Sequence, residues 1–321
     1  MYERLELAPA PAFVARRVGA YVRTNTDFLK CVAFIGLETE RGHFIPMGTC
    51  FFTSWEYEGF VFQFLTTAAH VLDGLPRDEF VVRLNTAAGV AQSLKVSRAE
   101  ATFHADRNND VAMIPMALNV AAFDIRLLNL NRAQINHARE TVWGIAQGDE
   151  VHAVGLYTSH HGLTRNIPVL RVGTLATLLD EPVSGPNGKY VEGYLIELRT
   201  IAGLSGSPVF VAPPPIRYKD GQAQFLASPP ILPLGILIGY HLVASKDDQI
   251  SVPRFQEGKP ASADEGDPYS LDERNTGFGI VIPIERLLDI VESDAIQVPV
   301  KAEIQRSKTD APFKPAGANK T

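Results

Sequence analysis

Cysteine, long apolar runs and basic charge are all scarce in this sequence. Cys31 and Cys50 are the only cysteines among 321 residues, too few for the disulfide framework of a small secreted domain. We expect both to be buried thiols, although on neighbouring strands they could also face each other. No uninterrupted apolar run reaches the length of about 18 residues that a membrane-spanning helix needs, which argues against a membrane protein.

The charged residues are dispersed along the chain. Lys and Arg number 30 and Asp and Glu number 36, which gives a net charge of −6 without the basic stripe of a nucleic-acid-binding protein. The opening "MYERLELAPAPAF" lacks the basic segment followed by an apolar core that marks a signal peptide. We therefore expect a cytoplasmic protein without nucleic-acid or membrane partners.

Short apolar runs separated by turns dominate the chain from residue 31 onward. "CVAFIGLE", "FVFQFLTTAAHV" and "LGILIGYHLV" are rich in the β-branched and aromatic residues of strands, and similar runs recur to "GFGIVIPI". This pattern predicts an all-β sandwich or barrel. Helical periodicity is limited to residues 13–22 and to "IERLLDIVES", with a weak candidate over 131–142.

These patterns divide the chain into three parts. We expect a helical arm over residues 1–30, the main domain over 31–293, and a disordered tail over 294–321, where the composition is polar and rich in Pro, Gly and Lys. Two insertions, 212–230 and 245–275, have the composition of surface loops.

Three residues in separate motifs are suited to amide hydrolysis. A serine nucleophile needs a base, a group that orients the base, and donors for the developing oxyanion. His70 ends the apolar run "FQFLTTAAHV", and Asp110 lies in a polar turn that enters another apolar run. Ser205 lies between Gly203 and Gly206, which permit a tight turn whose N–H groups converge. Each residue taken alone is also consistent with an ordinary packing or turn residue.

Together these motifs resemble those of trypsin-like, chymotrypsin-fold serine proteases. "TTAAHV" is similar to the histidine motif of that family, "NNDVAMI" to its aspartate motif and "GLSGSPVF" to its nucleophile turn. "GTCFFTS" resembles the strand before the histidine, and "GFGIVIPIERLLDIV" resembles the closing strand and helix of HtrA/Deg-type proteases, here without a PDZ domain. The resemblance covers residues 31–293 and implies two six-stranded antiparallel β-barrels followed by a helix.

The resemblance also implies roles for individual residues. Ser205 would be the nucleophile, His70 the general base and acid, and Asp110 the group that orients the imidazole. The backbone N–H groups of Gly203 and Ser205 would form the oxyanion hole. Protein or peptide substrates follow, and neither a cofactor nor a metal is implied. Leu204 stands where zymogen-activated trypsins have Asp, so activation by a new N-terminus is not expected.

The nucleophile turn most resembles that of glutamyl endopeptidases, which also read "SGSPVF". In those enzymes a Thr five residues before the nucleophile and a His on a strand bind a glutamate at P1, the substrate residue before the cleaved bond. Thr200 and His241 match these positions, so the resemblance implies a P1 preference for Glu or its amide, Gln. The "LVA" that follows His241 departs from the family's "WGG", and His241 could instead be a buried strand residue.

Two alternatives stay open. The pair His160-His161 lies in a Gly-flanked segment without cysteines or carboxylates at ligand spacing, which favours a solvated loop over a zinc site. The chain could also be a protease-fold binding module, or a latent enzyme whose insertions cover the cleft until a regulatory protein partner moves them.

Overall fold

The computed structural model describes residues 26–140, 144–184, 190–201, 203–225, 231–242, 254–256 and 275–310. Most of the arm expected over residues 1–30 lies outside this range. Its described end is a short 3-10 helix, η1 (Thr26–Lys30), in which Phe28 packs on Phe210 with ring centroids 4.5 Å apart. None of the described helices is long and apolar enough to cross a membrane.

The first sheet is built from the strands before residue 130. They are β1 (Val32–Glu38), β2 (Phe44–Tyr57), β3 (Phe60–Thr67), β4 (Glu79–Asn85), β5 (Ala91–Ser97), β6 (Thr102–Phe103), β7 (Ala112–Met116) and β8 (Leu128–Asn129). Their order is β5-β4-β1-β2-β3-β7-β6, and β8 pairs in parallel with β2. Among the described strands no pairing joins β5 to β6, so this sheet is open by its hydrogen bonds, whereas we predicted a closed barrel.

The second sheet closes into an antiparallel barrel. Its strands are β9 (Glu150–Gly155), β10 (Val169–Leu175), β13 (Tyr194–Glu197), β14 (Ser207–Ala212), β17 (Leu232–Leu242), β18 (Arg254–Gln256) and β19 (Asn275–Pro283). The order β14-β9-β10-β13-β19-β17 is closed by pairing of β14 with β17, which gives six strands, and β18 extends one edge. The predicted all-β class is confirmed.

Two small ribbons lie outside the sheets. The first pairs β11 (Val183–Ser184) with β12 (Tyr190–Val191), and the second pairs β15 (Ile216–Lys219) with β16 (Gln222–Phe225). The segment 212–230 therefore contains a β-hairpin where composition predicted only a loop. Of the insertion 245–275, only β18 and the start of β19 are described.

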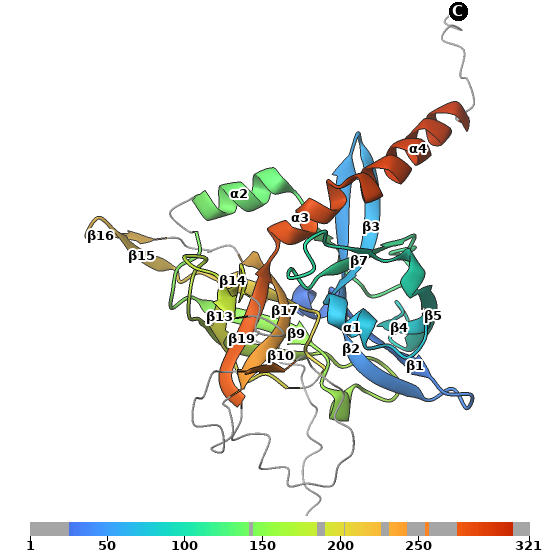
Figure 1. Cartoon of the computed structure of the whole chain (residues 1–321), viewed down its shortest axis with the longest axis horizontal. Coiled ribbons are helices and arrows are strands. Elements are labelled where there is room, and N and C mark those ends of the chain that lie inside the picture. Colours follow the sequence, from blue (N-terminus) through green and yellow to red (C-terminus); the bar gives the residue numbers. More distant parts are fainter. Residues whose placement is uncertain are drawn as a thin grey trace, which may run out of the picture.

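Four α-helices complete the described structure: α1 (Ala69–Asp73), α2 (Arg132–Glu140), α3 (Glu285–Val291) and α4 (Asp294–Asp310). In Figure 1, α3 leads from β19 of the barrel toward the first sheet, and α4 continues past β3. The prediction of a disordered tail over 294–321 is wrong for 294–310. Ile296, Val300 and Ile304 recur every four residues and are buried, so one face of α4 packs despite the polar composition.

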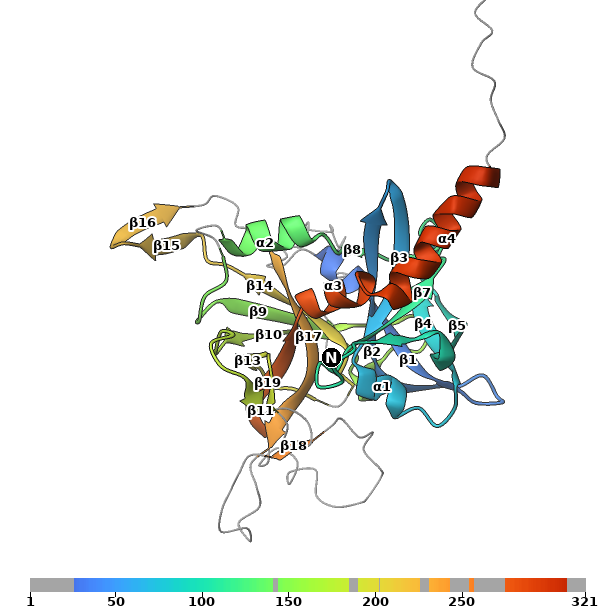
Figure 2. The same ribbon diagram turned by 45° about the horizontal axis from the view of Figure 1, so that its top comes forward.

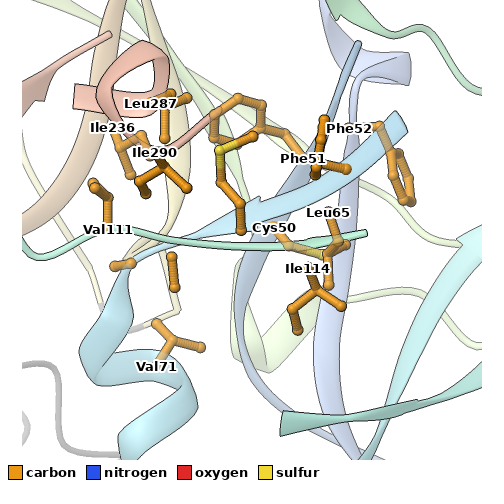
Figure 3. Packing of buried hydrophobic residues seen from close by; sticks show 14 of the residues in the cluster. Cys50, Phe51, Phe52, Leu65, Val71, Val111, Ile114, Ile236, Leu287 and Ile290 are labelled. Carbon is orange, nitrogen blue, oxygen red and sulfur yellow. The ribbon is translucent and has the colours of Figure 1, made fainter. Parts of the chain in front are cut away.

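The main core lies between the two sheets. Figure 3 shows Leu287 and Ile290 of α3 beside Ile236 of the barrel, with Val111, just before β7, and Leu65 of β3 in the same cluster. The same cluster contains Cys31 and Cys50, which are free thiols and buried, as predicted. Because α3 packs in the cluster shared by both sheets, it helps to fix their relative position, and the candidate site lies at this junction.

Candidate active site

His70 and Asp110 are brought together by the pairing of β3 with β7. Thr67 at the end of β3 lies opposite Ala112 at the start of β7, so the residues after the first strand meet those before the second. His70 lies in the first turn of helix α1 and not at a strand end, which corrects the prediction. The segment "TTAAHV" leaves the strand at Ala68, whose extended backbone precedes the helix.

Two contacts orient the imidazole of His70. The backbone N–H of His70 donates to Oδ1 of Asp110 at 2.8 Å, and ring Nδ1 lies in hydrogen-bond contact with Oδ2 of the same carboxylate. Each side chain is 9% exposed. Because an ionised carboxylate only accepts hydrogen bonds, Nδ1 carries the proton and Nε2 is the ring's acceptor. This tautomer is the one that a general base needs.

The Ser205 turn follows from its two flanking glycines. Gly203 has a φ of 95° and Gly206 a φ of 86°, values that side chains with a Cβ rarely adopt. Within the turn, the N–H of Ser207 donates to the carbonyl of Leu204 at 2.9 Å. A trans peptide holds its C=O and N–H in opposite directions, so this bond turns the N–H of Ser205 the other way.

The N–H groups of Gly203 and Ser205 are the predicted oxyanion donors. Within the described part of the chain, neither donates a hydrogen bond to another residue. Ser205 itself is half-buried, and Leu204 is buried. The two amides are therefore not used by contacts within the described turn, which is the condition an oxyanion hole requires.

Thr49 of β2 anchors this turn to the first sheet. Its N–H donates to the carbonyl of Ser205 at 3.1 Å, and its Oγ1 donates to the carbonyl of Gly203 at 2.7 Å. The same Oγ1 accepts from the N–H of Leu156 at 2.8 Å. Thr49 is fully buried, so these bonds are shielded from water. Sequence reasoning noted the motif "GTCFFTS" but missed the role of this hydroxyl.

Gly206 shows how closely the turn approaches the histidine segment. A Cβ on Gly206 would lie 2.1 Å from the carbonyl oxygen of Thr49, 2.4 Å from Oγ1 of Thr67 and 3.2 Å from the backbone nitrogen of Ala68. Ala68 is two residues before His70. The structure thus places the Ser205 turn against the segment that carries His70, so the three predicted catalytic residues belong to one locality.

The loop that follows β9 of the barrel packs against the Ser205 turn at Gly203. A Cβ on Gly203 would lie 2.9 Å from Cγ2 of Thr158, which follows β9. Gly162 and Leu163 lie further along this loop. Buried Arg83 of β4 donates to their carbonyls at 3.0 and 2.8 Å. Burial lowers the pKa of Arg83 from its usual range. The first sheet therefore holds a loop that contacts Gly203.

The predicted specificity residues lie on or beside strands of the barrel, with Thr200 in the segment between β13 and β14. Thr200 is buried, and its Cγ2 would lie 3.3 Å from a Cβ placed on Gly279 of β19. His241 lies in β17, paired in register with Phe255 of β18. The side chain of His241 is outside the described residues, so the structure does not bring these two side chains together.

Metal-ligand chemistry has no support in the described residues. They contain no group of three or more His, Cys, Asp or Glu side chains arranged to hold an ion. His160 ends the short 3-10 helix η3 (Thr158–His160), and the ring of His161 packs edge-on against Phe44 at a centroid distance of 5.7 Å. The pair His160-His161 thus lies in a docked loop.

Comparison of the sequence with models of protein families and with curated proteins finds no match. Among solved structures, the apo form of the MamO protease domain from Magnetospirillum magneticum has 14% sequence identity and a TM-score of 0.47, over 83% of this chain and 98% of that one. The HtrA-type protease AlgW with a decapeptide has 13% identity and a TM-score of 0.44, over 86% of this chain and 66% of that one. The inactive form of the Rv3671c protease, from M. tuberculosis, has 14% identity and a TM-score of 0.42, over 82% of this chain and 88% of that one. The chain is similar to these protease domains in fold alone.

Proposed function

We propose that this protein is a serine endopeptidase. The observation that carries the proposal is the double contact between His70 and the Asp110 carboxylate, made beside a glycine-flanked turn that presents Ser205. A buried carboxylate that fixes the tautomer of a histidine next to a serine is the arrangement of nucleophilic acyl transfer.

The proposed reaction has two halves. Oγ of Ser205 attacks the scissile carbonyl while its proton passes to Nε2 of His70, and the oxyanion is bound by the N–H groups of Gly203 and Ser205. The C–N bond then breaks, the leaving amine takes the proton from His70, and an acyl-enzyme remains. Water loses a proton to His70 and attacks the ester, which releases the acid and returns the proton to Ser205. Asp110 stays ionised and holds the imidazolium.

Hydrolysis of a denatured protein by the full chain tests the proposal, with mass spectrometry identifying the new termini. We expect cleavage by the natural chain and none by Ser205→Ala, whose folding is checked by its melting temperature. Equal cleavage by both would refute the assignment of Ser205. Tight binding of unfolded protein without cleavage by either chain would instead favour the binding-module alternative.

A P1 preference for Glu or Gln is the finer part of the proposal. Its support is the burial of Thr200 beside Gly279 and the position of His241 on β17, two strands of the same barrel. A hydroxyl and an imidazole can both donate to a carboxylate or amide. In a peptide library, cleavage after Glu or Gln should fall selectively in Thr200→Val and His241→Ala, and a library cleaved mainly after Lys, Arg or Phe would remove this preference.

A further inference from the structure

Arg83 of β4 is a buried cation whose guanidinium binds one loop of the barrel, the 156–168 loop between β9 and β10. Arg83 is 7% exposed. Besides the carbonyls of Gly162 and Leu163, it donates to Oδ1 of Asn166 at 2.9 Å. Among the described residues, these three neutral oxygens are the acceptors of its guanidinium. A buried charge is stable only when its donors are hydrogen-bonded, so the loop and Arg83 depend on each other for their positions.

The contact spans the junction of the two sheets. Figures 1 and 2 show β4 in the first sheet and β9 and β10 in the barrel, on opposite sides of this junction. Asn85, two residues after Arg83, lies on the same face of β4. Its Oδ1 accepts from the N–H of Asn166 at 2.7 Å, and its Nδ2 donates to the carbonyl of Asn166 at 3.1 Å. Two side chains of one strand therefore clamp the loop.

The same loop packs on Gly203 at its other end. Cγ2 of Thr158 and Cγ of Leu156 would lie 2.9 and 3.3 Å from a Cβ on Gly203, so they fill the space that a side chain there would take. Nδ1 of His161 lies in hydrogen-bond contact with the carbonyl of Thr158 at 3.2 Å. The N–H of Ile167 donates to the carbonyl of His161 at 3.0 Å. These bonds connect the clamped end of the loop to the end at Gly203.

Gly203 needs this packing because glycine adopts positive and negative φ about equally readily. Its φ is 95°. Thr49 holds the carbonyl of Gly203 at 2.7 Å and so fixes the peptide that follows it. The N–H of Gly203 belongs to the peptide before it, so its direction still depends on φ. Packing of the loop on Gly203 restricts this rotation and thereby the direction of the N–H.

We propose that Arg83 is a positioning residue for the oxyanion hole, which it aligns by holding the 156–168 loop against Gly203. This inference rests on the proposed function, in which the N–H of Gly203 binds the oxyanion. The described hydrogen bonds of Arg83 reach the loop and not the proposed triad, so Arg83 acts through the loop. The planar guanidinium suits this role because its donors have a fixed fork geometry, whereas a lysine ammonium is a point charge on a flexible stem.

Hydrolysis of a peptide that the natural chain cleaves, measured with full-length variants, tests this role. Arg83→Met keeps an aliphatic side chain but removes every donor, and Arg83→Lys keeps the charge with a different geometry. Ile304→Ala is the control for lost stability. Ile304 is buried on α4, so its truncation destabilises the protein without changing the loop. All rates are measured below the melting temperature of each variant.

We expect kcat and kcat/KM of Arg83→Met to fall together by about 10- to 100-fold, because a displaced donor weakens binding of the transition state and not of the substrate. Arg83→Lys should recover part of this loss, and Ile304→Ala should keep the kcat of the natural chain. Hydrogen exchange tests the clamp without activity. In a Ser205→Ala background, Arg83→Met should exchange the amides of the 156–168 loop at least about tenfold faster, and Ile304→Ala should not.

Three outcomes would overturn the role of Arg83 while the proposed function stands. They are a natural kcat in Arg83→Met, a loss confined to KM, and an equal loss of kcat in Ile304→Ala, which would assign the effect to stability. If Arg83→Met does not fold, Arg83→Lys provides the same comparison, with a smaller expected loss. A natural chain that cleaves no peptide would instead refute the proposed function, and the role of Arg83 with it.

Discussion

The hydroxyl of Thr49 donates to the carbonyl oxygen of Gly203 across the junction of the two sheets, at 2.7 Å. The backbone N–H of the same residue donates to the carbonyl of Ser205. Two carbonyls of the Ser205 turn are thus held by one residue of β2. Because each peptide is planar, these bonds fix the N–H groups of Leu204 and Gly206, and so hold the peptides on both sides of the one that carries the N–H of Ser205.

Thr49→Val removes the hydroxyl but keeps the shape of the side chain. We expect kcat for peptide hydrolysis to fall about 10- to 100-fold, less than the loss of an oxyanion donor, because the donors are loosened but not removed. KM should change little. Thr49→Ser retains the hydroxyl and should recover most of kcat. A defect of the same size in Thr49→Ser, or one confined to KM, would show that Thr49 does not act through the turn.

Gly206→Ala should prevent the turn from forming. Its φ of 86° is strained for alanine, and the new Cβ would lie 2.1 Å from the carbonyl oxygen of Thr49. Gly89 is a matched control, because its φ of 83° is similar and no atom lies within 4 Å of a Cβ placed there. We expect Gly89→Ala to cost about 1 kcal/mol of unfolding free energy and Gly206→Ala more than about 4 kcal/mol. Denaturant unfolding measures both, and equal costs would contradict the close approach.

Asp289 of α3 contributes a pH-dependent part of the stability. Burial alone would raise the pKa of its carboxyl, but hydrogen bonds from Arg286 and His104 outweigh burial and lower the pKa below its ordinary value. A lowered folded-state pKa stabilises the protein above the unfolded pKa of about 4, and this contribution is lost as pH falls through the folded value.

Asp289→Asn should therefore destabilise the protein at pH 7 and have a progressively smaller effect as the pH falls below about 4. The carboxylate is partly exposed, so solvent screening limits the expected loss to about 1 kcal/mol. Glu303→Gln is a control, because its pair with Arg306 lies on the exposed surface of α4. Thermal unfolding at several pH values measures the difference, and a loss that persists unchanged at pH 3 would exclude the ionised pairs as its cause.

The two cysteines should be inert in the folded protein. Burial raises the pKa of Cys31 to about 12, and it raises the pKa of Cys50 well above its usual range. Alkylation requires the thiolate, so at pH 8 iodoacetamide should label neither residue until the protein is unfolded, when it labels both. Rapid labelling of the native chain, read by mass spectrometry, would show that the core around β1 and β2 opens.

The strand pattern and the site motifs could be predicted from sequence because they are local. The apolar runs predicted most strands of both sheets, although not the polar β5, and the Gly-Leu-Ser-Gly turn marked Ser205. The sequence predicted His70 at the end of a strand, whereas it lies in the helix that follows. A five-residue helix has too little periodicity to detect beside an apolar strand. The contacts of Thr49 with Gly203 join residues 154 positions apart, so no local pattern contains them.

Helix α4 and the β15–β16 ribbon were missed for a different reason. Both have polar or Pro-rich sequences that composition assigns to tails and loops, yet each is held by tertiary contacts. Three apolar residues spaced four apart bury one face of α4, and the pair between Arg217 and Asp149 holds the ribbon. Their folding depends on surfaces formed elsewhere in the chain, which a reading of their own residues does not include.

Labelling with a fluorophosphonate probe tests the proposed catalytic site most directly. We expect the natural chain to be labelled at Ser205, Ser205→Ala not to be labelled, and His70→Ala and Asp110→Asn to be labelled at least about a thousandfold more slowly. Each variant should melt as a folded protein. Labelling of His70→Ala at the natural rate, or no labelling of the folded natural chain, would contradict the assignment of His70, Asp110 and Ser205 as a catalytic triad.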